Sequence, residues 1–298
     1  MSCPGMMSNV EGGVTKPPAG AARADKPRGV TAHEAFEGSA VFASLRTAYD
    51  TAMLGPRVAR LAVKPPIRWV GDAIIEANLN VRRCFIPLLI SQAIWIIGFG
   101  ILNFGEVAFT LGVADRAPGG VFVGFTREVS TWITMMILAG IAGSALAADI
   151  GARKIREELD AMAVLGVDTM RSLIVPRVMG MVYAALVLGL LGLLIPIGCY
   201  YIITPAFLEY TPAVYRESWY LNIQPVDLLS TFFKHAVMGF FIAMVACQRG
   251  LATKGGAEGV GLTVTQSVVV SFFGIWMFNS VYNIGFLTIF PDLLVLKG

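Results

Sequence analysis

The stretch VMGMVYAALVLGLLGLLIPIGCYYII, residues 178–203, contains no charged side chain along its whole length. About 20 consecutive apolar residues in an α-helix are enough to cross the roughly 30 Å hydrocarbon core of a bilayer. The stretch therefore predicts a membrane-spanning helix, and the segments on either side of it decide how many such helices the chain contains.

Four further runs have the same apolar character. An odd number of spans places the two termini on opposite sides of the membrane. The predicted fold class is therefore an all-α integral membrane protein with five transmembrane helices in one domain. The four runs are CFIPLLISQAIWIIGFGILNFG (84–105), STWITMMILAGIAGSALAA (130–148), LLSTFFKHAVMGFFIAMVAC (228–247) and VTQSVVVSFFGIWMFNSVYNIGFLTIF (264–290), and the domain is 83–290.

The composition of the whole chain agrees with this class. Of the 298 residues 56% are hydrophobic and 14% are charged, whereas soluble domains carry about 25% charged residues. A net charge of +3 is too small to indicate a nucleic-acid partner, and no base-reading motif is present. We expect no metal and no disulfide framework, because paired spacing is lacking among Cys3, Cys84, Cys199 and Cys247.

The segments outside the five-span domain are more polar. Residues 1–38 are rich in Gly, Ala, Pro and charge, which predicts a disordered tail, and the first apolar run starts too late for a cleaved signal peptide. Region 39–82 carries apolar stripes and Trp69 among basic residues, which favours amphipathic helices in the headgroup plane. An ordinary cytosolic helical elbow is the alternative. Residues 291–298 would form a short external C-terminus.

The distribution of Lys and Arg predicts the orientation. With the N-terminus inside, 18 of the 23 basic residues fall on inner segments, and Arg82 and Arg83 directly precede the first span. We therefore expect a cytoplasmic N-terminus and an external C-terminus, and we expect the membrane to be the plasma membrane.

The segment ARKIREELDAMAVLGVD, residues 152–168, is dense in charge between two apolar spans. Its apolar residues fall on one helical face, which predicts a helix over 152–165 that ends at Gly166. At 1.5 Å per residue this helix is about 21 Å long, so it should lie across the cytosolic face. Three i,i+4 ion pairs would form along it, each worth about 0.2 kcal/mol: Arg153–Glu157, Lys154–Glu158 and Arg156–Asp160. The pattern alone also suits a solvated loop helix.

The residue identities in this region indicate a protein family more specifically than its charge pattern does. The stretch 139–178, which includes AGSALAADIGARKIREELDAMAVLGVDTMRSLIVPRV, resembles the signature of the MlaE/YrbE family of ABC transporter permeases. CQRGLATKGGAEGVGLTVTQSVVVS (247–271) and TREVS (126–130) are similar to two other family segments. The resemblance covers roughly 65–290, and the motif residues are most similar to those of the actinobacterial YrbE-A type. The matching positions are Gly143, Ser144, Ala148, Asp149, Glu157, Glu158, Asp160, Ala161, Met162, Gly166, Pro176 and Arg177, where many members have Glu in place of Asp149.

The resemblance implies a subunit of a lipid transporter. In that family the charged helix is a coupling helix that docks on a cytosolic ABC ATPase. A second permease of the B type, MCE-domain proteins outside and a lipid substrate would complete the system. GGAEGVG (255–261) lacks the GK[ST] ending of a phosphate loop, so we expect this chain to need no cofactor and a separate subunit to bind ATP. The expected ATPase-coupling residues are Arg153, Glu157, Glu158, Asp160, Met162 and Gly166.

A second candidate site lies toward the outer side of the membrane. Lys234 is a charged residue inside an apolar run. It could extend to the outer surface, or it could pair with Glu128 or a lipid headgroup at the mouth of a pocket. Arg127 would lie at the same mouth or act as an interface anchor. Phe99 and Trp276 are candidates for the apolar pocket lining, although lipid-facing helices have the same composition.

Two other functions fit parts of the pattern. One is a permease of a small-solute ABC importer, which also carries a Gly and a downstream Pro near its coupling loop. The other is a membrane-embedded lipid enzyme. The chain has only His33 and His235, and no carboxylate–His constellation lies at an interface, so we expect a transport subunit rather than an enzyme.

Overall fold

The computed structural model describes residues 40–65, 67–113, 117–207 and 212–291. All regular structure in these ranges is helical, which confirms the predicted all-α fold class. The chain divides into two compact units, 1–45 and 46–298, and all five candidate spans lie in the second. The predicted tail, and the predicted C-terminus apart from Pro291, lie outside the described residues.

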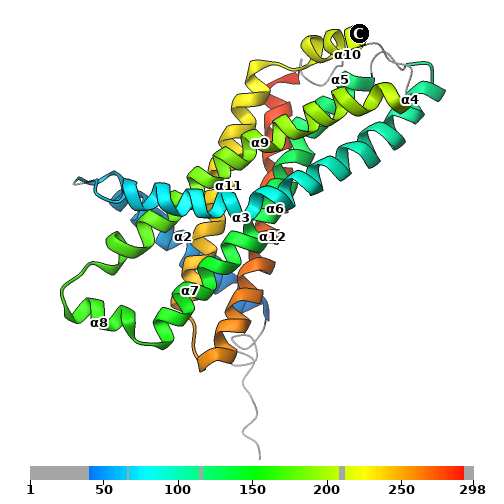
Figure 1. The fold of residues 1–298 in the computed structure, drawn as a ribbon. Helices are drawn as coiled ribbons and strands as arrows, with labels where there is room; N and C mark the ends of the chain where they lie inside the picture. Colours follow the sequence, from blue (N-terminus) through cyan, green and yellow to red (C-terminus); the bar gives the residue numbers. More distant parts are fainter. Residues whose placement is uncertain (1–39, 66, 114–116, 208–211, 292–298) are drawn as a thin grey trace, which may run out of the picture. The chain divides into compact units, whose positions relative to one another are not determined.

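Five helices in the described ranges are long and apolar enough to cross a membrane (Figure 1). Each covers the apolar run predicted for it to within one residue, so the protein is a multi-pass membrane protein. The five spans are Val70–Thr110, Ala117–Ile155, Met170–Ala206, Pro225–Leu251 and Gly256–Ile289.

The first three spans change helical pitch along their length. Short π-helical stretches, labelled η, interrupt their α-helices, and such stretches occur frequently at functional sites. Span one is α3 (Val70–Trp95), η1 (Ile96–Gly105) and α4 (Glu106–Thr110). Span two is α5 (Ala117–Gly124), η2 (Phe125–Val129), α6 (Ser130–Leu138), η3 (Ala139–Gly143) and α7 (Ser144–Ile155). Span three is η4 (Met170–Ile174) and α9 (Val175–Phe207), span four is α11 (Pro225–Leu251) and span five is α12 (Gly256–Ile289).

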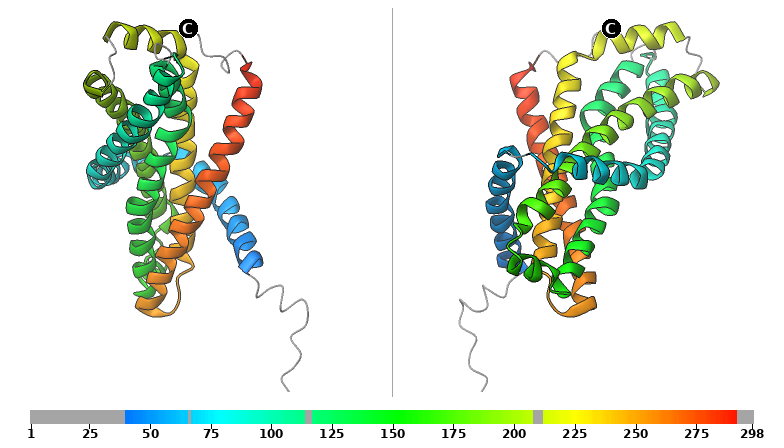
Figure 2. Two further views of the ribbon diagram at one scale, coloured as in Figure 1. Left: turned by 90° about the vertical axis from the view of Figure 1, so that its right-hand side faces the viewer. Right: turned by 60° about the vertical axis from the view of Figure 1, so that its left-hand side comes forward.

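The chain enters the first span through a sharp bend. Helix α2 (Ala40–Val63) ends just before Pro65, and α3 begins at Val70. The buried Trp69 side chain joins them, because its indole Nε1 donates to the carbonyl of Ala62 at 3.0 Å. Helix α3 then runs without a break to Trp95. No Gly or Pro lies between residues 73 and 83, and Pro87 lies inside the helix. Helix α3 packs against α9, and Figure 2 shows it running across the direction of the long helices before the chain turns at η1.

Helix α9 occupies the centre of the bundle, where it packs against both α3 and α11. Small residues bring the helix backbones together. A Cβ added at Gly239 of α11 would lie 2.5 Å from the Cβ of Ala185 on α9, so only glycine fits there. Large buried side chains fill the rest of the core, among them Leu138, Ile150, Ile174, Met181, Leu188 and Ile242.

The two ends of the bundle carry different connections. The short helix α8 (Glu158–Val164) joins spans two and three, and α10 (Pro212–Asn222) joins spans three and four. Because consecutive spans run in opposite directions, α8 and α10 lie on opposite sides of the membrane. Helix α10 packs on α5, where the amide of Gly119 donates to Ser218 Oγ at 2.9 Å.

Candidate functional site

The connecting segment, residues 152–166, is not the single helix predicted from its sequence. Helix α7 of span two continues to Ile155, and α8 begins only at Glu158. Between them Glu157 adopts φ 58°, and no other non-glycine among the described residues has a positive φ. The left-handed region costs an L-residue roughly 1–2 kcal/mol, so other contacts must hold this turn.

Those contacts are ion pairs that link the end of α7 and the turn after it to α8. The i,i+4 pairs predicted along a continuous helix are wrong, because the turn at Glu157 changes which side chains meet. Arg156 Nε lies 2.7 Å from Glu158 Oε1, and Arg153 Nη1 lies 3.3 Å from Glu158 Oε2. Lys154 Nζ lies 3.1 Å from Asp160 Oδ1. All of these side chains are at least 32% exposed, and exposed pairs contribute only about 0.2–1 kcal/mol each.

Gly166 ends α8 as the sequence predicts. Its φ is +73°, and two bonds form a Schellman motif: Val167 N donates to Met162 O, and Gly166 N donates to Ala163 O, each at 3.0 Å. A side chain at this position would strain the turn. The glycine therefore sets the angle at which the chain leaves α8 for span three.

The exposed surface of the connecting segment is both charged and apolar. Glu157 and Asp160 are exposed, and Met162 is half-buried. Val164 is 88% exposed and Leu165 is 79% exposed, and the sequence analysis did not select either. Adjacent exposed aliphatic residues outside the membrane are typical of a protein-docking surface. Their signal in the sequence was the apolar pair directly before the terminating glycine.

The connecting segment is fixed to the bundle by Arg177 at the start of α9. Arg177 Nη2 lies 2.6 Å from Asp149 of α7, and Arg177 Nε lies 3.5 Å from Glu76 of α3. The Arg177 side chain is only 12% exposed, so these pairs are less screened than those of the connecting segment. Three spans are thereby tied together next to the connecting segment. The sequence match included Asp149 and Arg177 but could not show that they touch.

A second group of polar residues lies within the membrane-spanning region, and we call it the polar cluster: Arg127, Glu128, Asp227, Lys234, Asn279 and Asn283. Lys234 is 1% exposed and does not extend to the surface. Its Nζ donates to Arg127 O, to Asn283 Oδ1 at 3.1 Å and to Asn279 Oδ1 at 3.3 Å. The ammonium also lies 5.7 Å from the centroid of the Tyr282 ring, within the range of a cation–π interaction.

Glu128 and Lys234 are joined through two asparagines rather than by a direct bond. Asn279 Nδ2 donates to Glu128 Oε2, and Asn283 Nδ2 donates to Glu128 Oε1. Each amide therefore accepts from the ammonium and donates to the carboxylate. The four-residue spacing of the asparagines on α12 places both on one face, so the arrangement satisfies two charges in a medium where unpaired charge is costly.

Arg127 faces a different partner from its neighbour Glu128. Its Nε lies 2.7 Å from Asp227 Oδ1, and its Nη2 donates to Asp227 Oδ2 at 3.3 Å, a bidentate pair. Asp227 is 2% exposed and also accepts from Gln224 N at 3.1 Å, which caps the start of α11. The pair therefore joins span two to the beginning of span four. Asp227 was not selected from the sequence, because it lies 100 residues from Arg127.

Phe99 and Trp276 are brought together as the two ends of an aromatic row. The Phe99 ring is tilted against Trp95 at 5.3 Å between ring centroids, Trp95 meets Trp132 edge-on at 5.4 Å, and Trp132 stacks on Trp276 at 5.2 Å. Phe99 is 53% exposed and Trp276 is 49% exposed. Since Trp276 precedes Asn279 by three residues, the row is one helical turn from the polar cluster on α12.

Residues 85–284 match the family model described as Permease MlaE. The chain belongs to the MlaE permease family. It is 35% identical over 219 residues to a probable ABC transporter permease of Synechocystis, covering 69% of this chain and 82% of that protein. A probable ABC transporter permease of Rickettsia bellii is 30% identical over 210 residues, covering 70% and 80%.

A third relative of this MlaE permease is the chloroplast protein TRIGALACTOSYLDIACYLGLYCEROL 1 of Arabidopsis thaliana. It is 34% identical over 170 residues, and the match spans 57% of this chain and about half, 49%, of the relative. The family predicted from the charged segment is thus confirmed. The matched range 85–284 contains the connecting segment and the polar cluster, so both belong to the MlaE domain.

Proposed function

We propose that this MlaE permease is the membrane subunit of an ATP-driven lipid transporter, and that it moves lipids such as phospholipids, fatty acids or sterols across or out of the plasma membrane. Family membership supports transport rather than catalysis, and one relative carries the name of a galactolipid. The observation that carries the proposal is the connecting segment, which presents ion pairs and two exposed aliphatic residues outside the membrane.

This segment would dock on a cytosolic ABC ATPase, which would bind the ATP. The contacts would be Arg153, Glu157, Glu158, Asp160 and Met162, with Gly166 holding the exit angle, and Val164 and Leu165 added from their exposure. Arg177 supports a coupling role, because motion of α8 would reach α3, α7 and α9 through its two ion pairs. The orientation that follows has a cytoplasmic N-terminus and an external C-terminus.

The polar cluster would then lie toward the outer leaflet, with the aromatic row beside it. A lipid headgroup could exchange with the amides around Lys234 and Glu128 while its chains contact Phe99 and Trp276. A second permease of the B type would complete the membrane unit, and MCE-domain proteins would bind outside. These partners rest on the family resemblance.

Charge reversal at Glu157 and Glu158 tests the docking proposal. We expect the double variant E157K/E158K to remain in the membrane but to lose co-purification of the ATPase and lipid transport, because two acids proposed to contact the ATPase would become cations. The matched control is Glu258→Lys, which lies at the start of span five on the same side of the membrane as α8. Full transport with the ATPase still bound would refute the assignment, and uptake of a polar solute instead of lipid would indicate the small-solute importer.

A further inference from the structure

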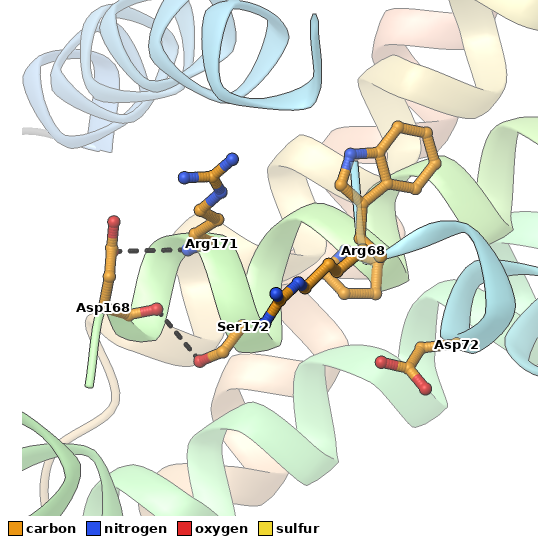
Figure 3. Close-up of a pocket in the computed structure, with 7 residues that line it drawn as sticks. Arg68, Asp72, Asp168, Arg171 and Ser172 are labelled. Carbon is orange, nitrogen blue, oxygen red and sulfur yellow. Dashed lines mark hydrogen bonds between the residues drawn. The ribbon is translucent and has the colours of Figure 1, made fainter. Parts of the chain in front are cut away.

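A cavity of about 390 Å³ lies between the bend before α3 and the start of span three. Its lining includes no residue of the connecting segment or of the polar cluster. Sites for small ligands measure roughly 300–1,000 Å³, so this cavity is large enough for a headgroup-sized molecule. Figure 3 shows its lining residues, which are Arg68, Trp69, Asp72, Asp168, Arg171, Ser172 and Pro176.

The cavity lies at the edge of the membrane. Span one begins at Val70 and span three at Met170, and because both are odd-numbered spans they begin on the same side, which is the side of α8. Arg68 stands just before the first of these starts, and its neighbour Ile67 is 53% exposed. Arg and Trp beside an exposed aliphatic residue are typical of the headgroup layer. A molecule that reaches this cavity from the bilayer is therefore a lipid, entering by its headgroup.

The cavity contains charges of both signs in fixed places. Asp168 Oδ1 accepts from the amides of Met170 at 3.1 Å and Arg171 at 3.3 Å, so its carboxylate is held at the start of η4. Arg171 Nη2 donates to the carbonyl of Lys64 at 2.8 Å, which fixes this guanidinium against the end of α2. The positions of these two charges are thus set by the backbone before any ligand arrives.

The opposite wall adds one more charge of each sign. Arg68 points from the start of α3 toward the side where Asp168 and Ser172 lie, whereas Asp72 stays on the α3 side (Figure 3). Neither Arg68 nor Asp72 forms an ion pair with any part of the chain that the structure describes. Two guanidinium groups and two carboxylates therefore surround one space, and the charges on the α3 wall are available to a ligand.

We propose that this cavity binds the headgroup of a zwitterionic phospholipid from the leaflet on the α8 side. The phosphate faces Arg68 and Arg171, whose planar guanidinium groups suit phosphate oxygens. The ammonium faces Asp72 on the α3 wall, and Asp168 on the opposite wall adds a second negative charge to the cavity. A purely anionic lipid would place its charge near two carboxylates without a compensating cation, so the acids act against it. The bound lipid joins the bend between α2 and α3 to the start of span three. This inference does not depend on which lipid is transported.

Native mass spectrometry of the purified full-length chain tests the proposal with two probes of identical acyl chains, phosphatidylethanolamine and phosphatidylglycerol. We expect retention of phosphatidylethanolamine to exceed that of phosphatidylglycerol by about tenfold, the equivalent of one hydrogen bond to a charged group. D72N/D168N should abolish this preference while both lipids still bind. The amide oxygen that D168N introduces can still accept from the backbone amides at the start of η4, so the fold is preserved.

Removal of the phosphate contact gives the second arm. Arg68→Gln should lower retention of both lipids by roughly tenfold, whereas Arg82→Gln, an exposed arginine further along α3, should change neither. Equal retention of the two lipids by the unaltered chain, or a preference that survives D72N/D168N, would overturn the proposal. Displacement of the lipid by soluble phosphoethanolamine at equal concentration would also overturn it, since the ligand would then be a free phosphate compound.

Discussion

In the connecting segment the acidic side chains stand in water, with Asp160 65% exposed, whereas in the polar cluster Lys234 is 1% exposed. Both regions balance Lys, Arg, Asp and Glu. The exposed pairs are direct and weak, because water screens them and competes for their atoms. Among the buried charges, Arg127 pairs directly with Asp227, and Lys234 and Glu128 are linked through amide groups that satisfy ammonium and carboxylate together. The same residue types therefore form ion pairs that exchange readily on the exposed connecting segment and fixed contacts in the buried polar cluster.

This difference suits the roles proposed for the two regions. A docking surface must exchange its own ion pairs for those of a partner, which costs little when each contributes about 0.2–1 kcal/mol. The polar cluster joins spans two, four and five, and separating its buried charges is costly because each charge would lose its partner. A lipid headgroup could therefore exchange into it only by supplying replacement partners.

The largest effect expected is at Lys234. Lys234→Met should destabilise the protein by about 3–5 kcal/mol, because Glu128 and the carbonyl of Arg127 lose their buried cation. The midpoint of unfolding in a detergent titration measures this loss. In the double variant K234M/E128Q the uncompensated carboxylate is gone, so the double variant should be more stable than Lys234→Met alone. If the loss of stability in the double variant equalled the sum of the losses in Lys234→Met and Glu128→Gln, Lys234 and Glu128 would not act as one unit.

The five spans could be predicted from sequence because each contains a predominantly apolar run of sufficient length, and recognising such a run needs no knowledge of contacts. The polar cluster could be predicted only in part. Lys234 and Glu128 attract attention as charges near apolar runs, but the bridging amides of Asn279 and Asn283 lie 45 and 49 residues beyond Lys234. Only the packing of α11 on α12 shows that they meet.

The turn at Glu157 could not be predicted for a different reason. Glutamate rarely adopts a positive φ, and the regular spacing of acids and bases favours a continuous helix. The turn forms because Arg153, Lys154 and Arg156 all reach acids on α8 once the chain bends there. Gly166 was predictable, since glycine is the usual residue at the end of a helix.

A smaller effect is expected at the apolar end of α8. V164S/L165S should weaken association with the ATPase by roughly tenfold or more, because each buried aliphatic side chain contributes about 1.5–3 kcal/mol on transfer from water. Both residues are exposed in this chain, so its own stability should not change. The matched control is L111S/V113S, the same substitutions on exposed residues at the opposite side of the membrane. Binding to immobilised permease measures the affinity, and an equal loss in both variants would contradict docking at α8.

The smallest effect expected is a difference between glycine and alanine at two neighbouring positions, Glu157 in the strained turn and Glu158 in α8. At Glu157 glycine should be more favourable than alanine by roughly 1 kcal/mol, since only glycine adopts φ 58° without strain. At Glu158, the first residue of α8, the order should reverse by a similar amount, because glycine weakens a helix relative to alanine. Hydrogen exchange of the amides at 161–165 measures both comparisons within α8. If glycine were the less favourable residue at both positions, the chain would be helical through Glu157, and the division of the connecting segment into two helices would be wrong.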